Sequence, residues 1–254
     1  MIKTAFITGA TSGFGRATAL VFATNGYNVI LNGRRQDRLR ELAAYIEEKH
    51  GVKTLISAFD VRDKKAVNDS INALPEEWKA IDVLVNNAGL ALGLTDIQDG
   101  DTELWDTMID TNVKGLLYMT RAIAPLMIIR KQGHIINIGS IAGKEVYPKG
   151  NVYCATKHAV DALNKAMRID LLPHNIKVTA VNPGLAETEF SIVRFSGDEE
   201  RAKKVYEGFT SLAPEDVAEV IWFAASRSAH VNLNDIIITP TAQANSRDVV
   251  REAV

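Results

Sequence analysis

Apolar and polar positions follow two alternating patterns along the chain. Short runs rich in β-branched residues predict seven strands, at 4–8, 28–32, 53–59, 82–87, 134–140, 177–182 and 235–239. Longer runs, in which apolar residues recur every three or four positions, predict helices at 13–25, 36–49, 63–73, 102–131, 151–172 and 214–226. The first six strands carry apolar residues on both faces, which is typical of parallel strands covered on both sides.

The order of these elements predicts the fold class. Repeated strand–helix units favour a parallel sheet with right-handed crossovers and helices on both faces. We therefore expect an α/β protein of the doubly wound Rossmann type, with a mostly parallel sheet of about seven strands. No low-complexity linker or change of composition divides the sequence, so residues 1–254 are expected to form a single domain.

Two segments do not fit this repeat. Residues 184–212 make a connection longer than usual after the carboxyl end of a predicted strand, and such a connection predicts a substrate lid. The tail 240–254 is polar and carries Arg247 and Arg251. We expect it to be either a frayed end or an arm that reaches another subunit.

Composition narrows the classes of function. The net charge of −2 gives no electrostatic reason to expect binding to nucleic acid or to an anionic membrane. No leader pattern opens the sequence and no apolar run reaches about 18 residues, so we expect a cytoplasmic protein. The single cysteine, Cys154, excludes an internal disulfide and suits a reducing compartment. The five histidines are scattered, so no metal site is expected.

A glycine-rich turn follows the first predicted strand and opens the first helix. In "TGATSGFG" (8–15), the glycines Gly9, Gly13 and Gly15 allow a tight turn and a close approach of backbone N–H groups to a pyrophosphate. The sequence therefore predicts a dinucleotide site here. The alternative is a glycine-rich turn without a ligand. Three further residues of the turn are assigned to the same site: Thr11, Ser12 and Phe14.

Basic residues follow the second strand, where an NAD site usually has an acid for the ribose 2′-hydroxyl. The sequence there is "NVILNGRRQDR", with Arg34 and Arg35 and no acid before Asp37. Arginine binds phosphate through forked, charge-assisted hydrogen bonds. We therefore expect NADP(H), bound first by Arg34 and next by Arg35. The alternative is that both arginines only begin an exposed helix.

Candidate catalytic residues lie at the fifth strand and in the helix that follows it. Tyr153 and Lys157 are four positions apart, so they share one helical face. A phenol is a poor base near neutral pH unless a nearby positive charge favours the phenolate, which Lys157 can supply. Ser140 ends a predicted strand and can polarise a substrate oxygen. Each of these residues alone has an ordinary structural explanation, and only their combination with the glycine turn favours catalysis.

These motifs together resemble the short-chain dehydrogenase/reductase family over nearly the whole chain. They comprise the glycine turn, "DV" (60–61), "NNAG" (86–89), "TNVKG" (111–115), Ser140, "YCATK" (153–157) and "NPG" (182–184). The resemblance implies that Lys157 also holds the nicotinamide ribose, that Asn112 holds a water in a proton relay, and that the protein is a homotetramer. It also implies the remaining cofactor contacts: Asp60 and Val61 at the adenine, Asn87, Ala88 and Gly89 in the cleft, and Pro183, Gly184 and Thr188 beside the nicotinamide. For Thr188 a helix cap is an equal alternative.

Substrate choice is less visible in the sequence. "NAGLALG" (87–93), "GHIINIGS" (133–140) and "PGLAETEFS" (183–191) are similar to bacterial NADP-dependent 3-hydroxy acid dehydrogenases of the serine type and to sulfoacetaldehyde reductases. Arg194 in the lid can bind a carboxylate or a sulfonate, and Tyr147 and Asn151 can add hydrogen bonds. We expect a dehydrogenase for small 3-hydroxy acids. The alternatives are a sulfoacetaldehyde reductase that forms isethionate and, from another class, an NADP-binding regulator without turnover.

Overall fold

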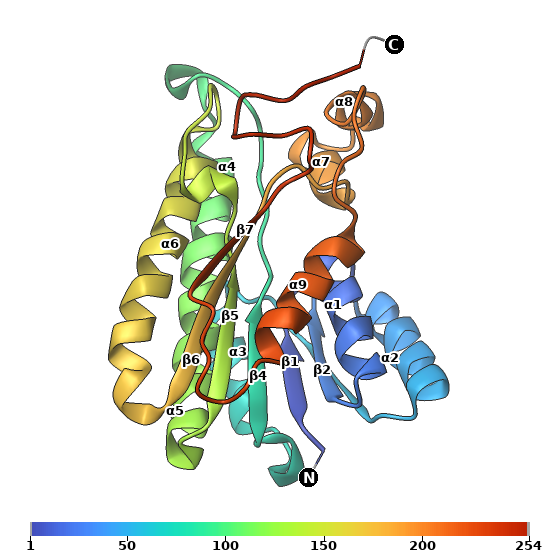
Figure 1. Ribbon diagram of the computed structural model, residues 1–254, viewed down its shortest axis with the longest axis vertical. Helices are drawn as coiled ribbons and strands as arrows, with labels where there is room; N and C mark the ends of the chain where they lie inside the picture. Colours follow the sequence, from blue (N-terminus) through green and yellow to red (C-terminus); the bar gives the residue numbers. More distant parts are fainter. Residues whose placement is uncertain (1, 253–254) are drawn as a thin grey trace.

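A seven-stranded parallel sheet forms the centre of the computed structural model, which describes residues 2–252 (Figure 1). The strand order is β3-β2-β1-β4-β5-β6-β7, and every neighbouring pair is parallel. The predicted fold class is thus confirmed. The strands are β1 Thr4–Ile7, β2 Asn28–Gly33, β3 Thr54–Ala58, β4 Ile81–Asn86, β5 Gly133–Ile138, β6 Ile176–Pro183 and β7 Asp235–Ile238.

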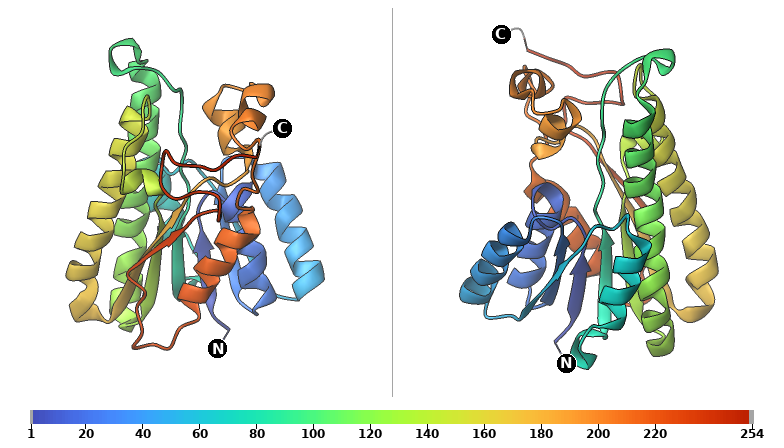
Figure 2. Two further views of the ribbon diagram at one scale, coloured as in Figure 1. Left: turned by 45° about the horizontal axis from the view of Figure 1, so that its top comes forward. Right: turned by 180° about the vertical axis from the view of Figure 1, so that it is seen from behind.

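Helices cover both faces of the sheet, as Figures 1 and 2 show from several sides. Alternate strand residues face opposite layers: Val29 and Leu31 pack with α1, α2 and α9, whereas Ile30 packs with α3, α5 and α6. The helices are α1 Gly13–Thr24, α2 Gln36–His50, α3 Lys64–Asn72, α4 Thr102–Ile109, α5 Leu116–Arg130, α6 Asn151–Leu171, α7 Glu189–Arg194, α8 Glu199–Lys204 and α9 Pro214–Ala225. Single 3₁₀ turns are at Glu76–Trp78, Ile97–Asp99, Ile141–Gly143 and Leu172–His174.

The chain changes direction within the sheet between β1 and β4. From β1 it builds outward to β2 and β3, then returns to place β4 on the other side of β1. In a doubly wound sheet, ligands bind beyond the carboxyl ends of the strands at such a point. The residues after β1 and β4 meet there, since the Asn87 N–H donates a 2.9 Å hydrogen bond to the Thr8 hydroxyl.

The prediction of one continuous helix over residues 102–131 is wrong. The run 102–131 is divided into α4, a π-helical segment at Asp110–Gly115, and α5. Such wider turns insert into α-helices and are frequent at functional sites. The segment contains Asn112, which is buried.

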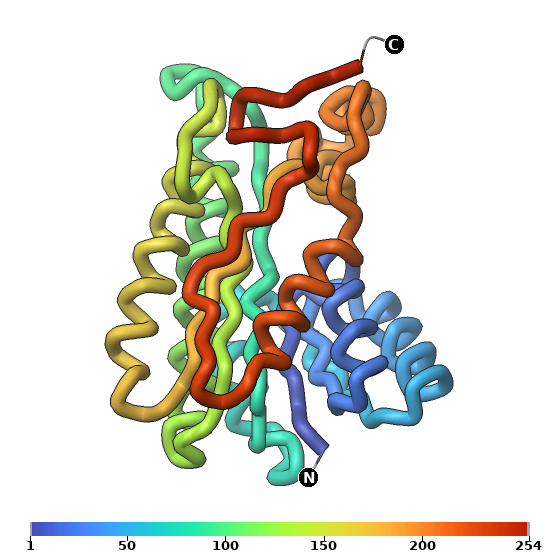
Figure 3. The backbone as a smooth tube through the Cα atoms, in the orientation of Figure 1, coloured from blue at the N-terminus to red at the C-terminus, as the bar shows by residue number. Residues whose placement is uncertain are grey.

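The lid and the tail pack against each other. The predicted lid contains the short helices α7 and α8, and the tail crosses it from the end of β7, as the tube in Figure 3 shows. Arg251 Nη2 donates to Val205 O at 2.9 Å, and the Glu252 N–H donates to Gly208 O at 2.8 Å. The described tail therefore lies on its own lid instead of fraying, and its role as an arm to another subunit stays a prediction.

Among residues 2–252, no helix combines the length and the apolar character that crossing a membrane requires.

Candidate active site

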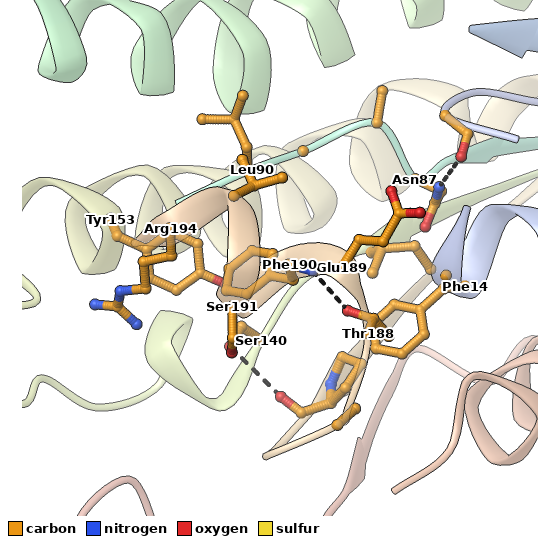
Figure 4. Close-up of a pocket in the computed structure, with 18 of the residues that line it drawn as sticks. Phe14, Asn87, Leu90, Ser140, Tyr153, Thr188, Glu189, Phe190, Ser191 and Arg194 are labelled. Carbon is orange, nitrogen blue, oxygen red and sulfur yellow. Dashed lines mark hydrogen bonds between the residues drawn. The ribbon is translucent and has the colours of Figure 1, made fainter. Parts of the chain in front are cut away.

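A cavity of about 570 Å³ lies between the carboxyl ends of the strands and the lid. In Figure 4, Tyr153 and Arg194 lie toward one end of it and Phe14 and Asn87 toward the other. The residues predicted for the site that line it are Gly9, Thr11, Ser12, Gly13, Phe14, Arg34, Arg35, Asp60, Val61, Asn87, Ala88, Gly89, Ser140, Tyr147, Tyr153, Lys157, Pro183, Gly184, Thr188 and Arg194. Three predicted residues do not line it: Gly15, Asn112 and Asn151.

The glycine turn has the geometry of a phosphate cradle. Gly9 and Gly13 adopt φ angles of 67° and 49°, which side-chain-bearing residues rarely adopt. A Cβ on Gly15 would lie 2.2 Å from Gly9 O, so the close packing beneath the turn requires a glycine there. Gly15 itself does not line the cavity. Helix α1 begins here with no acid in its first turn and no side-chain cap from Ser12. Its N-terminal N–H groups therefore suit an anionic ligand, and the turn fits a pyrophosphate.

Asn87 fixes this turn from the neighbouring strand. Its side-chain amide donates to Thr8 O at 2.8 Å and Gly9 O at 3.3 Å. The backbone N–H of Ala88 donates to the Thr8 hydroxyl at 2.9 Å. The segment after β4 thus lines the cavity and also sets the shape of the glycine turn.

Three arginines, which we call the arginine rim, lie where β2 passes into α2: Arg34 and Arg35, which line the cavity, and Arg38 behind them. Arg35 Nη2 donates to the hydroxyls of Thr11 and Ser12, both at 2.9 Å. Arg34 is farther out: its side chain is 62% exposed, and its Nη1 lies 3.7 Å from Asp60 Oδ2. Arg35 is therefore built into the glycine turn, whereas Arg34 is free to meet a ligand.

Asp60 is held as a carboxylate in the cavity wall near Arg34. Burial alone would raise the pKa of Asp60, but hydrogen bonds and charge from Arg62, with a contribution from Arg34, outweigh burial and lower it. Arg62 Nη2 lies 2.7 Å from Asp60 Oδ2. Beside it, Val61 packs so closely on Gly115 that a Cβ on Gly115 would lie 2.7 Å from it.

Tyr153 is buried at the end of the cavity where Arg194 lies. Burial raises the pKa of Tyr153, the neighbouring Tyr147 raises it further, and the Ser140 hydroxyl and the Arg194 charge lower it by less. The phenol is therefore protonated near neutral pH and can donate a proton. Two cations flank its ring, because Lys157 Nζ and Arg194 Cζ lie 5.9 and 5.8 Å from the ring centroid.

Lys157 is a buried cation with one main-chain partner. Its Nζ donates to Ile138 O at 2.9 Å, at the end of β5. Burial lowers the pKa of Lys157 to about 8. It shares the helical face of Tyr153, as the four-residue spacing predicted. Its Nζ lies over the Tyr153 ring, but its hydrogen bond goes to Ile138 and not to the phenol oxygen.

Ser140 caps the short turn after β5. Its Oγ accepts a 3.1 Å hydrogen bond from the Ala142 N–H and donates a long one, 3.4 Å, to Pro183 O. A hydroxyl has one donor and two acceptor positions. Ser140 therefore serves as a cap, and because its bond to Pro183 is long, its one hydrogen can turn instead to an acceptor in the cavity beside Tyr153.

Asn112 lies behind the cavity wall. Its side chain exchanges hydrogen bonds with the main chain of Leu90, donating to the oxygen at 2.8 Å and accepting from the N–H at 2.9 Å. It also donates to the Thr156 hydroxyl at 3.0 Å. Asn112 thus ties the π-helical segment to α6 and to the segment after β4, and the water-holding role stays a prediction.

Helix α7 supplies the outer wall. Thr188 caps it by accepting from the Phe190 N–H at 3.1 Å, which matches the capping alternative, and its own hydroxyl hydrogen remains for the cavity. Phe190 packs its ring at an angle on Tyr153, with centroids 5.6 Å apart. Phe190 was not predicted from the sequence as a site residue. Thr188 followed by an acid is a helix-start pattern that would have revealed α7, with Phe190 and Arg194 on one face.

Arg194 and Tyr147 lie together beside Tyr153. Arg194 Cζ is 5.5 Å from the centroid of Tyr147, and Arg194 Nε donates to Gly93 O at 3.3 Å. A guanidinium has five N–H donors, and Gly93 accepts only one. Burial raises the pKa of Tyr147, with Arg194 opposing it, so the phenol stays neutral. We call Arg194 and Tyr147 the anion pair, because the two side chains together can bind an anion.

Asn151 is used elsewhere. Its side-chain amide donates to Thr95 O at 2.9 Å, and its Oδ1 accepts from the Val152 N–H at 2.7 Å. It borders a small separate hollow and ties the loop after β4 to the start of α6. Within residues 2–252, no three His, Cys, Asp or Glu side chains are placed to hold a metal ion.

Comparison with known proteins gives a consistent result. Residues 3–198 match the family model described as short chain dehydrogenase. The chain is 49% identical over 238 residues to the NADP-dependent 3-hydroxy acid dehydrogenase YdfG of Salmonella typhi, covering 93% of this chain and 94% of that protein. It is 48% identical over 239 residues to sulfoacetaldehyde reductase 2 of Chromohalobacter salexigens, covering 94% of each.

A solved structure agrees with these sequence relatives. The closed form of a serine dehydrogenase complexed with NADP⁺ superposes with a TM-score of 0.92 at 45% identity, covering 98% of this chain and all of that one. The seven-stranded parallel sheet agrees with the fold of this structural neighbour. The chain therefore belongs to the short-chain dehydrogenase family.

Proposed function

We propose that this protein transfers a hydride between NADP(H) and a small anionic hydroxy or carbonyl substrate, and that the substrate is a 3-hydroxy acid of the serine type. The reaction class follows from the family: the protein is an oxidoreductase acting on CH–OH and C=O groups. The observation that supports the substrate class is the position of Arg194 and Tyr147 beside the buried Tyr153 in one cavity.

NADP(H) suits the other end of the cavity. The glycine turn would hold the pyrophosphate, Arg34 the 2′-phosphate, and Thr188 the carboxamide. Lys157 would hold the nicotinamide ribose. When bound, the nicotinamide supplies or accepts the hydride. Relatives that are named for NADP support this cofactor.

The protein groups manage the proton. In reduction, the neutral Tyr153 phenol donates its proton to the substrate oxygen while the Ser140 hydroxyl polarises that oxygen. Burial keeps the phenol protonated before this step. In oxidation, Tyr153 accepts the proton, and the positive charges of Lys157 and Arg194 beside its ring stabilise the phenolate.

The anion pair accepts either of two charged groups. A carboxylate and a sulfonate both take forked hydrogen bonds from a guanidinium. Reduction of sulfoacetaldehyde to isethionate is therefore the second candidate, and the sulfoacetaldehyde reductase relative favours it. A regulator without turnover is the third, and the intact set of Ser140, Tyr153 and Lys157 in one cavity argues against it.

We also propose a single-domain, cytoplasmic homotetramer. One continuous sheet runs from Thr4 to Ile238, which supports one domain. Large apolar side chains are exposed on α6, α9 and β7, including Ile169, Phe223 and Ile237, and self-association would cover them. Light scattering after size exclusion tests the assembly: a mass of four chains is expected, and a monomer at micromolar concentration contradicts it.

A substrate screen tests the function. NADP⁺ reduction is measured with serine, 3-hydroxypropionate, isethionate and a neutral alcohol, and NADPH oxidation with the matching carbonyl compounds. We expect the highest kcat/KM with a 3-hydroxy acid. A clear preference for sulfoacetaldehyde selects the second candidate, and tight NADPH binding without turnover on any substrate selects the regulator.

A further inference from the structure

Helix α7 is attached at both ends, to opposite sides of the cavity. At its start, Glu189 accepts hydrogen bonds from Arg35 Nη1 at 2.8 Å and Arg38 Nη1 at 2.6 Å. At its end, Arg194 exchanges hydrogen bonds with Gly93: the Gly93 N–H donates to Arg194 O at 3.1 Å, and Arg194 Nε donates back at 3.3 Å. The helix therefore crosses the cavity mouth between α2 and the segment after β4.

The position of α7 determines what surrounds the reacting atoms. Between the two attachments, Phe190 lies against Tyr153, and Ser191 shares a 2.7 Å hydrogen bond with the Tyr206 hydroxyl. Arg194, one helical turn after Phe190, lies beside Tyr147 and Tyr153. If α7 moved away, Tyr153 would gain water and the anion pair would come apart.

The two attachments differ in kind: the one at Gly93 includes a backbone hydrogen bond, whereas the one at Glu189 consists of side-chain ion pairs. The Glu189 carboxylate and both of its arginine partners are 40% or more exposed, so these ion pairs can break and re-form readily. Burial alone would raise the pKa of Glu189, but hydrogen bonds from Arg38 and Arg35 outweigh burial and lower it, so the carboxylate is charged. A reversible attachment of this kind is what a lid needs to admit and release ligands.

Arg35 has little left to offer a ligand. Its Nε and Nη2 are bonded to Thr11, its Nη2 also to Ser12, and its Nη1 to Glu189. Arg38 has Glu189 as its one hydrogen-bond acceptor within residues 2–252. In the described part of the chain, the one polar contact of the Arg34 side chain is the 3.7 Å ion pair with Asp60. The arginine rim is therefore divided between two tasks.

We propose that Glu189 is a positioning residue that fastens the lid to Arg35 and Arg38, while Arg34 alone carries the preference for the 2′-phosphate. We call the Glu189–Arg35–Arg38 group the lid latch. It rests on the proposed function only in that NADP(H) is the ligand covered by the lid. Because the latch does not touch the 2′-phosphate, its loss should weaken NADPH and NADH alike.

The latch is tested first without any ligand. Trypsin cleavage within α8, at Arg201, Lys203 and Lys204, reports how often the lid opens. Glu189→Gln should speed this cleavage about three- to tenfold. Added salt should speed cleavage of the unaltered protein but not of the variant, because exposed ion pairs are screened. Glu187→Gln is the matched control: it changes the same charge in the same segment, and Glu187 has no ion pair within residues 2–252.

Binding then separates the latch from a phosphate role. Glu189→Gln should raise the Kd of NADPH and that of NADH alike, about three- to tenfold. Arg38→Ala leaves the Arg35–Glu189 pair, so it should raise both by a smaller factor, and the double variant should be no worse than Glu189→Gln. Unchanged cleavage in Glu189→Gln overturns the latch, and so does tighter binding of NADPH alone, which would make Glu189 a competitor of the phosphate. Neither readout needs a substrate, so failure of the substrate assignment leaves the test intact.

Discussion

The two ends of the cavity are built in opposite ways. The side chains of Arg34, Arg35 and Arg38 are 43–62% exposed and bonded to acids or hydroxyls. Tyr153 and Lys157 are 9% and 7% exposed, and burial shifts the pKa of both toward the neutral form. The end with the arginine rim thus consists of charges that remain in water, whereas the end with Tyr153 and Lys157 holds groups whose charged forms burial disfavours.

From this difference we expect the exposed arginines to affect the affinity for the cofactor and the buried groups to affect the rate of the reaction. Exposed ion pairs are individually weak, so the arginine rim can exchange its partners without unfolding the chain. A buried titratable group is costly in its charged form, so burial raises the pKa of the Tyr153 phenol and lowers that of the Lys157 ammonium. Substitutions at the two ends should therefore change different measurable quantities.

The largest effect is expected at the buried end. Tyr153→Phe removes the proton donor while keeping the ring on which Phe190 packs. Its kcat should fall by about 10³-fold, within the range of general acid–base contributions. The Kd of NADPH, measured by fluorescence titration, should stay within about twofold. Turnover within tenfold of the unaltered enzyme would remove Tyr153 from the proton transfer.

The exposed end should show the complementary result. Arg34→Ala should raise the Kd of NADPH by about 10- to 100-fold, the range of a charge-assisted hydrogen bond, and leave that of NADH unchanged. Arg35→Ala should weaken both cofactors, because Arg35 also holds Thr11 and Ser12 in the glycine turn. Equal losses for both cofactors in Arg34→Ala would refute the phosphate role.

The pH profile of reduction sharpens the comparison. Burial lowers the pKa of Lys157 to about 8, so it is protonated below that pH and loses its charge above it. The kcat/KM for reduction should fall up to tenfold per pH unit above about pH 8, since kcat/KM reports the free enzyme. Lys157→Arg, whose side chain stays charged, should lose this alkaline fall. An unchanged profile would assign the fall to another group.

A smaller and opposite effect is expected on stability. The lowering of the Lys157 pKa from 10.5 to about 8 corresponds to an unfolding free energy about 3 kcal/mol lower at neutral pH. A Lys pKa lowered by folding costs stability below the folded pKa, and this cost disappears as pH rises through the unfolded value. Lys157→Met should thus raise Tm by a few degrees at pH 7 and by less at pH 10, measured by calorimetry. A lower Tm at pH 7 would mean that the hydrogen bond to Ile138 outweighs burial.

The features that local sequence patterns predicted are those that depend on residues a few positions apart. The strand and helix periods predict the parallel sheet, and the glycine turn and the four-residue Tyr153–Lys157 spacing predict which residues meet in the cavity. Each of these depends on neighbours a few positions away. The residues were therefore identifiable before their surroundings were known.

Pairings across long sequence distances were not predictable. Glu189 and Arg35 are 154 positions apart and meet only because the lid lies over α2. Asn151 was expected at the substrate, yet its amide is taken by Thr95 on a distant loop. The π-helical turn at Asn112 depends on its bonds to Leu90 and Thr156, which no helical period encodes.

The central claim is that Arg194 selects an anion beside Tyr153, and one comparison of substrates tests it most directly. The kcat/KM for NADP⁺-dependent oxidation is measured with 3-hydroxypropionate and with the neutral 1,3-propanediol, in the unaltered enzyme and in Arg194→Ala. We predict a preference for the acid of at least about 30-fold that falls about tenfold or more in the variant, through KM for the acid alone. Equal use of the two alcohols, or a preference that survives in Arg194→Ala, would contradict the account.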